Sequence, residues 1–155
     1  MDEDACMARA IALSFEGIAA GGGPFGAAVV GPQGILGEGR NNVVPGRDPT
    51  LHAEVVAIRA ACALLGSHDL RGAVPYTSCE PCPMCLGAAW WARCSAVVYG
   101  NGRAEAAAIG FDDAAIYAEV ARPVQARVLP LRRLMATEAL EAFTAWTAKA
   151  DRAPY

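Results

Sequence analysis

Residues 81–85, Pro-Cys-Pro-Met-Cys, and residues 52–54, His-Ala-Glu, decide the fold of this chain and the chemistry it can support. Cys82 and Cys85 are three positions apart, so on a helix they share one face. Together with His52 they supply three ligands that zinc prefers, and three protein ligands leave one position of a tetrahedral ion open. The sequence therefore predicts one Zn²⁺ bound by His52, Cys82 and Cys85, in a catalytic rather than a structural arrangement.

Segment 81–85 also predicts where its two cysteines lie on a helix. Pro83 suits the first turn of a helix over about 83–92, which puts Cys82 at the helix N-terminus. The partial positive charge there lowers the pKa of a thiol, so both cysteines are expected to bind as thiolates. A water molecule on such an ion has a pKa of about 7, and hydroxide is then available at neutral pH.

Glu54 is the carboxylate that this metal site does not need as a ligand. On a continuous helix, the side chains of His52 and Glu54 would diverge by about 200°. They can converge only where a helix begins, and the sequence predicts a helix over about 51–65. Glu54 is then placed to take the proton of the water molecule and pass it to a substrate. The alternative, Glu54 as a fourth ligand, would close the site.

Length and composition limit the remaining classes. A chain of 155 residues with 54% hydrophobic composition predicts one domain over 1–155. The net charge of −3 gives no electrostatic footprint for nucleic acid. Without a long apolar run no segment is expected to span a membrane. The acidic N-terminus is unlike a signal peptide, and three of the six cysteines lie at 79, 82 and 85, so we expect metal binding in the reducing cytoplasm.

The order of expected elements predicts an α/β protein. Helices are expected over 4–20, 51–65, 83–92, 110–120 and 134–149, and strands over 25–30, 35–40, 73–77, 95–99 and 127–129. The first two strands form a hairpin through a Gly-Pro-Gln-Gly turn. This order predicts a three-layer α/β/α sandwich around a mixed five-stranded sheet.

With these residues in hand, the chain resembles the cytidine-deaminase-like zinc deaminase superfamily, whose signature is H-x-E followed by P-C-x-x-C. Within it, the chain is similar to the guanine deaminases. The segments that carry the resemblance are 23–27, 41–42, 48–55, 77–88 and 110–113. The resemblance implies the cytidine-deaminase-like fold and a small-molecule purine as substrate.

The resemblance also implies a reaction and a set of residue roles. Zinc hydroxide would attack C2 of guanine, Glu54 would shuttle the protons, and xanthine and ammonia would leave. Asp113 would assist proton transfer and bind the N1/N2 edge, for which a carboxylate suits guanine better than adenine. The substrate contacts implied are Phe25, Asn41, Ala53, Trp91, Asp113 and Tyr155.

Several alternatives stay open at this point. Segment 101–105 departs from some bacterial members and leans toward guanosine deaminases, so guanosine is the alternative substrate; tRNA adenosine deamination is less favoured because the chain is acidic. The resemblance implies a homodimer, with exchange of the C-terminal segment between subunits left open. Cys79 is interpreted as a buried residue at a strand end rather than as a ligand.

Overall fold

The computed structural model describes residues 2–154, and these divide into two compact units, the first extending to Tyr117 and the second beginning at Ala118. The first unit contains α1 (Glu3–Ala19), β1 (Gly26–Gly31), β2 (Gly34–Arg40), α2 (Val43–Gly46), α3 (Ala53–Leu65), β3 (Val74–Cys79), α4 (Pro83–Trp91), β4 (Val98–Asn101) and α5 (Arg103–Ala108). Helix α6 (Asp113–Ala121) begins in the first unit and ends in the second, which also holds a 3₁₀ turn (Val124–Ala126) and α7 (Ala136–Ala148).

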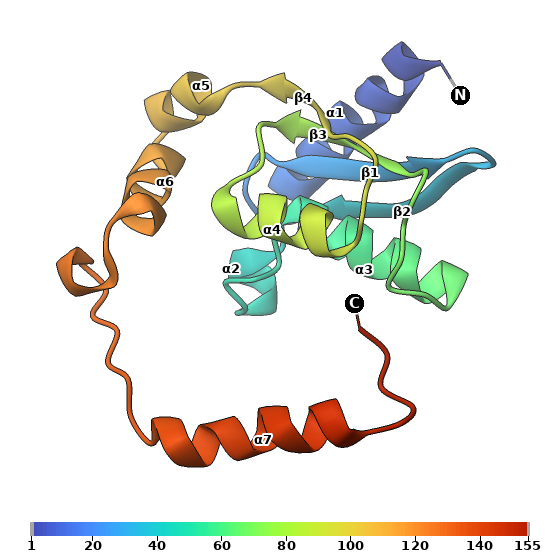
Figure 1. Ribbon diagram of the computed structural model, residues 1–155. Coiled ribbons are helices and arrows are strands. Elements are labelled where there is room, and N and C mark those ends of the chain that lie inside the picture. Colours follow the sequence, from blue (N-terminus) through green and yellow to red (C-terminus); the bar gives the residue numbers. More distant parts are fainter. Residues whose placement is uncertain (1, 155) are drawn as a thin grey trace. The chain divides into compact units, whose positions relative to one another are not determined.

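The sheet of the first unit has four strands in the order β2-β1-β3-β4 (Figure 1). Strand β1 pairs antiparallel with both β2 and β3, whereas β3 pairs parallel with β4. The predicted hairpin and the mixed character of the sheet are thus confirmed. The α/β class is confirmed as well, but the sheet formed by the described residues has four strands and not the predicted five.

The predicted fifth strand over 127–129 is wrong. This segment is irregular, and its side chains Val128 and Leu129 are exposed. Pro123 and Pro130 bracket it closely, and proline cannot donate a ladder hydrogen bond. The backbone N–H of Leu129 instead donates to the Glu119 carboxylate at 3.0 Å. Two apolar residues after Arg127 are too short a pattern to distinguish a strand from an extended connection.

Helices cover both faces of the sheet, as the three-layer prediction requires. In Figure 1, α1 lies against one face and α3 with α4 against the other. The larger core cluster lies between the sheet and the helices α3 and α4, with Val29, Ala57 and Leu70 buried at its centre. A smaller cluster around Ala10 and Tyr76 joins α1 to the sheet.

Two glycines let helices approach the sheet at backbone distance. A Cβ on Gly39 of β2 would overlap the carbonyl oxygen of Ala53 at the start of α3, and a Cβ on Gly26 of β1 would overlap the carbonyl oxygen of Ala10 in α1. The absence of both side chains allows close helix–sheet packing. Gly39 therefore fixes the N-terminal end of α3 against the sheet, which is the end that carries His52 and Glu54.

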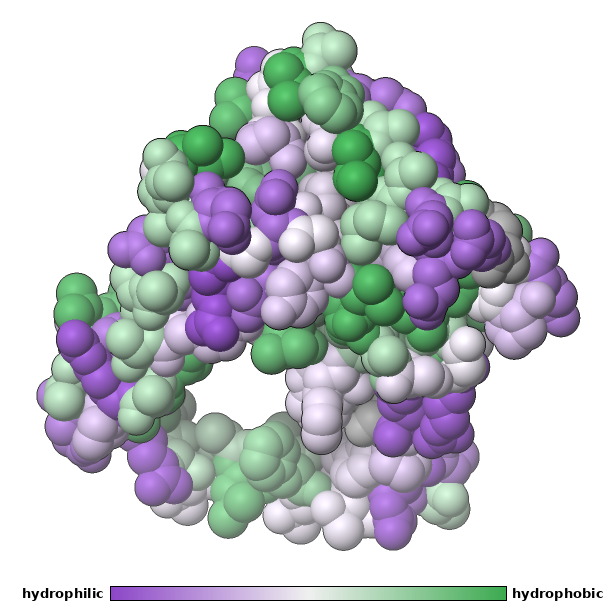
Figure 2. Space-filling model, turned by 90° about the horizontal axis from the view of Figure 1, so that it is seen from above, coloured by the Kyte–Doolittle hydropathy of each residue, from purple (hydrophilic) through white to green (hydrophobic). Residues whose placement is uncertain are grey.

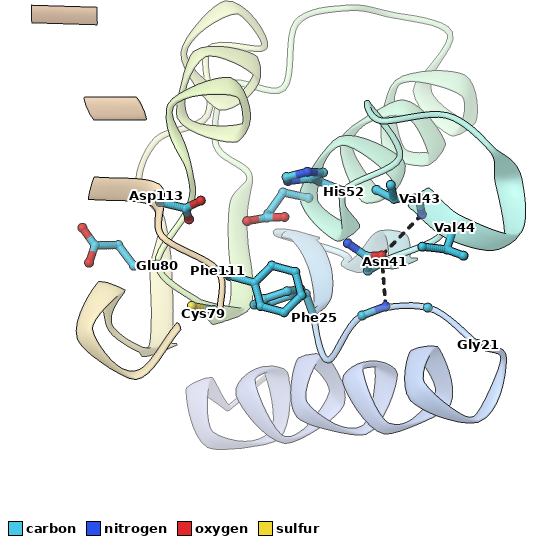
Figure 3. Close-up of a pocket in the computed structure, with 13 residues that line it drawn as sticks. Gly21, Phe25, Asn41, Val43, Val44, His52, Cys79, Glu80, Phe111 and Asp113 are labelled. Carbon is cyan, nitrogen blue, oxygen red and sulfur yellow. Dashed lines mark hydrogen bonds between the residues drawn. The ribbon is translucent and has the colours of Figure 1, made fainter. Parts of the chain in front are cut away.

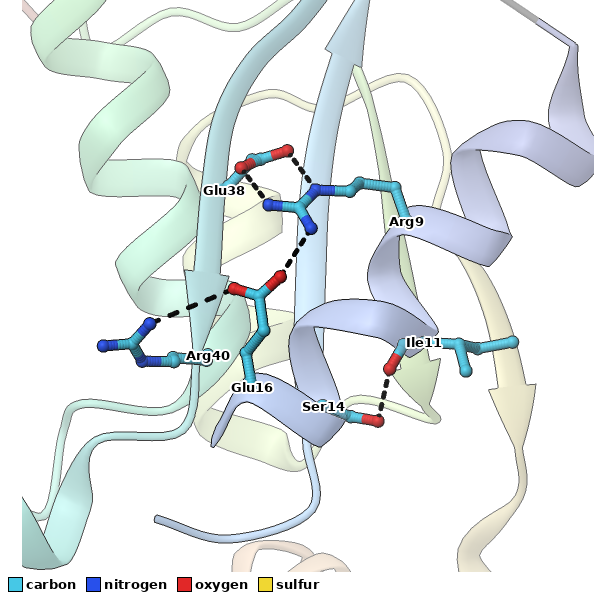
Figure 4. Close-up of polar contacts among 6 residues, drawn as sticks. All are labelled: Arg9, Ile11, Ser14, Glu16, Glu38 and Arg40. Carbon is cyan, nitrogen blue, oxygen red and sulfur yellow. Dashed lines mark hydrogen bonds and ion pairs between the residues drawn. The ribbon is translucent and has the colours of Figure 1, made fainter. Parts of the chain in front are cut away.

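A network of charged side chains links α1 to strand β2 (Figure 4). The Arg9 guanidinium donates to both carboxylate oxygens of Glu38, at 2.7 and 2.8 Å, and to Glu16 at 2.7 Å. Two parallel hydrogen bonds between a guanidinium and a carboxylate are a strong, directional contact. Arg9 consequently lowers the pKa of Glu38 below its usual range.

The second unit buries little of its apolar surface. Leu140, Phe143 and Trp146 of α7 are 58%, 72% and 45% exposed, and α7 has no buried residue among those described. Hydrophobic residues also interrupt the hydrophilic surface on the face seen in Figure 2.

Among residues 2–154, every helix is too short or too polar to span a membrane.

Candidate active site

Three side chains from two helix starts converge to form a candidate metal centre. The Nδ1 atom of His52 lies 3.6 Å from the sulfur of Cys82 and 3.5 Å from the sulfur of Cys85, and the two sulfurs are 3.6 Å apart. Ligands bound at 2.0–2.3 Å to a tetrahedral ion are expected about 3.3–3.8 Å apart. The three atoms therefore form one face of a tetrahedron of the size that zinc requires.

The local backbone explains how these residues meet. His52 and Cys82 each occupy the N-cap position of a helix, α3 and α4, with extended backbone angles (φ −69°, ψ 151° and φ −67°, ψ 168°). Pro83 follows Cys82 as the first residue of α4, where its fixed φ suits the first turn. Cys85 lies one turn further on, so its sulfur returns to that of Cys82.

The electrostatics of the three ligands favour a bound cation. The Cys82 pKa is lowered to about 4, first by the hydrogen bond from the Cys85 thiol and then, against burial, by His52. The same bond raises the pKa of Cys85, with burial and the nearby Glu54 carboxylate adding to the effect. These contacts thus favour the ionised form of the Cys82 sulfur. A bound divalent cation would displace the proton that the two sulfurs share, so that both could ionise.

Glu54 lies beside this centre without belonging to it. It is the second residue of α3, is 9% exposed, and its carboxylate lies near the Cys85 thiol. In the described chain, the group of mutually close metal-ligating atoms consists of His52, Cys82 and Cys85 alone. An ion held by these three atoms would keep a fourth coordination position for a small molecule. Burial raises the pKa of Glu54 above its ordinary value, and a carboxyl group that binds its proton more tightly is better able to carry it to a substrate.

A cavity of about 350 Å³ opens onto His52 and Glu54. Figure 3 shows Asp113 and Glu80 on one side of it and His52 and Asn41 on the other. Its lining consists of Gly21, Gly22, Gly23, Phe25, Asn41, Val43, Val44, His52, Glu54, Cys79, Glu80, Phe111 and Asp113. This volume and the mixture of apolar walls with a few polar groups are typical of a small-molecule site.

Asn41 is held in a fixed orientation by its neighbours. Its side-chain oxygen accepts hydrogen bonds from the backbone N–H groups of Gly23 at 3.1 Å and Val43 at 3.3 Å. These bonds are drawn as dashed lines in Figure 3. Because the oxygen is used in this way, the Nδ2 group, which carries two donors, is the part of Asn41 available to an acceptor on a ligand.

The sequence-predicted contacts are distributed unevenly around the cavity. Phe25, Asn41 and Asp113 line it, and Ala53 is buried next to His52 at the start of α3. Trp91, the last residue of α4, is 61% exposed and is not among the residues that line this cavity in the described chain. Tyr155 lies outside the described residues. The roles of all these side chains toward a substrate stay predictions.

Sequence reasoning missed several walls of the cavity. Phe111 meets Phe25 edge-on, with ring centroids 4.8 Å apart, and the two aromatic rings form one wall. Val43 and Val44 belong to α2, a four-residue helix in a segment for which neither a helix nor a strand was predicted. Cys79 is buried at the end of β3, as interpreted, but it also lines the cavity. No regular spacing in the sequence connects these residues, because only the tertiary structure brings them together around the cavity.

Comparison with known proteins gives the same picture at the level of families. Residues 1–101 match the model of the cytidine and deoxycytidylate deaminase zinc-binding region. The guanine deaminase of Bacillus subtilis is 48% identical over 156 residues, covering all of this chain and all of that protein. The X-ray structure of a guanine deaminase from Bacillus subtilis superimposes with a TM-score of 0.96, covering 100% of this chain and 99% of the other.

Two further relatives bear on the type of substrate. A structure solved in complex with 8-azaguanine is 40% identical with a TM-score of 0.67, covering 70% of this chain and 64% of the other. The tRNA-specific adenosine deaminase of Haemophilus influenzae is 34% identical over 117 residues, covering 72% of this chain and 68% of that protein. Similarity to the guanine deaminase is thus more extensive than to the tRNA enzyme.

Proposed function

Because the chain belongs to the cytidine and deoxycytidylate deaminase zinc-binding family, we propose that its site hydrolyses guanine to xanthine and ammonia. The observation that carries this proposal is the triangle of His52, Cys82 and Cys85 beside the buried carboxylate of Glu54. The full-length similarity to a guanine deaminase identifies the substrate. The protein is a hydrolase that acts on a C–N bond of a cyclic amidine, and zinc is its cofactor.

The residues of this chain divide the reaction among themselves. His52, Cys82 and Cys85 hold the zinc ion, which when bound supplies a water molecule acidic enough to act as the nucleophile at neutral pH. Glu54 takes a proton as the new C2–O bond forms and delivers it to the adjacent ring nitrogen. Glu54 then carries the second proton to the exocyclic amine, which leaves as ammonia. Water and guanine are consumed, and xanthine and ammonia are formed.

The cavity walls orient the base for this transfer. The Nδ2 donors of Asn41 suit the O6 and N7 acceptors of guanine, and the Asp113 carboxylate suits its N1–H and N2–H₂ donors. The edge-to-face pair of Phe25 and Phe111 offers an apolar wall for the purine ring. The further contacts implied by the resemblance, the backbone of Ala53, Trp91 and Tyr155, belong to the same proposal.

The assembly and location are also proposed. The exposed apolar stripe of α7, together with the family resemblance, supports a homodimer, and exchange of the C-terminal segment between its subunits stays open. Six free cysteines, two of them metal ligands, support action in the reducing cytoplasm. We also propose that residues 1–155 act as one functional domain, although the described chain divides into two compact units.

A substrate panel tests the proposal directly. Ammonia release would be measured with guanine, guanosine, cytosine, cytidine and adenine at equal concentrations of the zinc-loaded protein. Guanine is expected to have the highest kcat/KM. A higher value for guanosine would favour the alternative substrate, and turnover of none of the five would contradict the proposed function.

A further inference from the structure

Helix α6 carries Asp113 to the cavity, yet it has no buried residue among those described. A helix with so little buried surface is not held by a hydrophobic core, so individual side-chain contacts must fix its position. Before the helix, the Phe111 ring meets Phe25. Within it, Tyr117 provides a second attachment, and Asp113 lies between these two points in sequence.

Tyr117 is anchored to the segment that leads into the metal centre. Its hydroxyl donates a hydrogen bond of 2.9 Å to the carbonyl oxygen of Pro81, the residue immediately before the ligand Cys82. The Arg103 guanidinium lies over the Tyr117 ring, 4.4 Å from its centroid. A cation at this distance from an aromatic ring is attracted to its face.

Arg103 is itself fixed to the same segment. Its guanidinium pairs with the Glu80 carboxylate at 2.9 Å, and its backbone N–H lies 3.3 Å from a Glu80 oxygen. In Figure 3, the carboxylate of Glu80 points away from the cavity, whereas that of Asp113 points toward it. We call the contacts among Glu80, Arg103 and Tyr117 the clamp. It attaches α6 to the adjacent residues Glu80 and Pro81.

Asp113 and Tyr117 are four residues apart on α6, so their side chains share one face of the helix. Fixing the Tyr117 ring against Pro81 therefore fixes the rotation and depth at which Asp113 meets the cavity. We propose that Tyr117, held by Arg103 and Glu80, is a positioning residue that sets Asp113 against the metal centre for its contact with the substrate. This inference rests on the proposed function of Asp113.

Tyr117 affects turnover through the position of Asp113, and not through the neighbouring ligand Cys82. Tyr117→Phe keeps the ring beneath Arg103 and removes only the hydroxyl. We expect kcat/KM for guanine to fall about 5- to 10-fold, since loss of one neutral hydrogen bond loosens the helix without unfolding it. Zinc content is expected to stay at the wild-type value.

A double-mutant cycle separates positioning from general destabilisation. In an Asp113→Asn background, Tyr117→Phe should change kcat/KM by less than about 2-fold, because residues that act through one another are not additive. Tyr76→Phe is the matched control, since its hydroxyl bonds to Glu3 at 3.4 Å, on the α1 side of the sheet. That variant is expected to leave kcat/KM unchanged. Full additivity of Tyr117→Phe with Asp113→Asn, or loss of zinc in the single variant, would overturn the proposal.

Hydrogen exchange provides a readout that does not depend on turnover. In the zinc-loaded protein, the amides of residues 113–121 should exchange faster in Tyr117→Phe and in Arg103→Ala than in the wild type or Tyr76→Phe. Unchanged exchange over 113–121 in both variants would refute the clamp. If the wild type fails to turn over guanine, the proposed function fails, while this exchange measurement still tests the attachment of α6.

Discussion

Replacement of Glu54 by glutamine separates the catalytic role of this side chain from its structural one. Glutamine has nearly the same shape, so the cavity and the three metal ligands stay in place. Glu54 is asked to move a proton twice, first to the ring nitrogen and then to the leaving amine. The slower of the two transfers limits the rate, and one general acid–base step contributes about 10²–10⁴-fold, so we expect kcat/KM to fall about 10²–10⁴-fold. This loss corresponds to about 2.7–5.5 kcal/mol of transition-state stabilisation.

The assay combines ammonia release from guanine with zinc analysis of the same sample. We expect one zinc per chain in Glu54→Gln, as in the wild type, together with the loss of turnover. Glu38→Gln serves as the matched control, because that carboxylate bonds to Arg9 on the α1 side of β2. Turnover of Glu54→Gln within tenfold of the wild type would refute Glu54 as the proton carrier, and loss of zinc would make it a ligand.

Glu54→Gln should also change how the stability of the metal-free protein depends on pH. Burial raises the pKa of Glu54 above its ordinary value of 4.5. The folded chain therefore holds this proton more tightly than the unfolded chain, and ionised Glu54 reduces stability as the pH rises through its folded pKa. Metal-free Glu54→Gln should be at least as stable as the wild type at pH 7, and a difference of this origin should vanish below about pH 4.5. A lower melting temperature of the variant at pH 7 would contradict this.

Three other predictions concern the metal centre, the packing of α3 against the sheet, and the ion pair between α1 and β2. Cys82→Ala should lose zinc and lower the melting temperature together, measured by metal analysis and calorimetry, because metal binding stabilises the fold; a full zinc complement would exclude Cys82 as a ligand. Gly39→Ala should destabilise the protein by about 1–3 kcal/mol, since a Cβ there overlaps the backbone of α3, whereas Gly87→Ala, which meets no atom within 4 Å, should not. Glu38→Gln should cost about 0.5–1 kcal/mol of unfolding free energy at pH 7, discounted for the solvent exposure of the pair. Because Arg9 lowers the pKa of Glu38 from 4.5, this difference should shrink as the pH falls below that value; a pH-independent difference in denaturant titrations would refute the assigned pair.

The metal ligands could be predicted from the sequence because helix geometry constrains them locally. The interval between Cys82 and Cys85 is one helical turn, and Pro83 marks where that turn begins. The partner His52 and its neighbour Glu54 could be read in the same way from the start of a second helix. These inferences needed no knowledge of how distant segments pack.

The rest of the site depends on tertiary structure. The wall formed by Phe25 and Phe111 joins residues more than eighty positions apart, and no periodic pattern links them. Tyr117 was not singled out, because a tyrosine on a short helix shows its importance only through its bond to Pro81. The predicted strand over 127–129 is wrong for a related reason, because a three-residue segment with two apolar side chains does not specify a neighbouring strand.

X-ray absorption at the zinc edge of the purified protein tests most directly whether one imidazole and two thiolates hold a catalytic ion. The predicted spectrum has two sulfur scatterers at about 2.3 Å and two nitrogen or oxygen scatterers at about 2.0–2.1 Å, one of them from solvent. Three or four sulfur scatterers, which would bring in Cys79 or another thiol and close the site, would contradict the account.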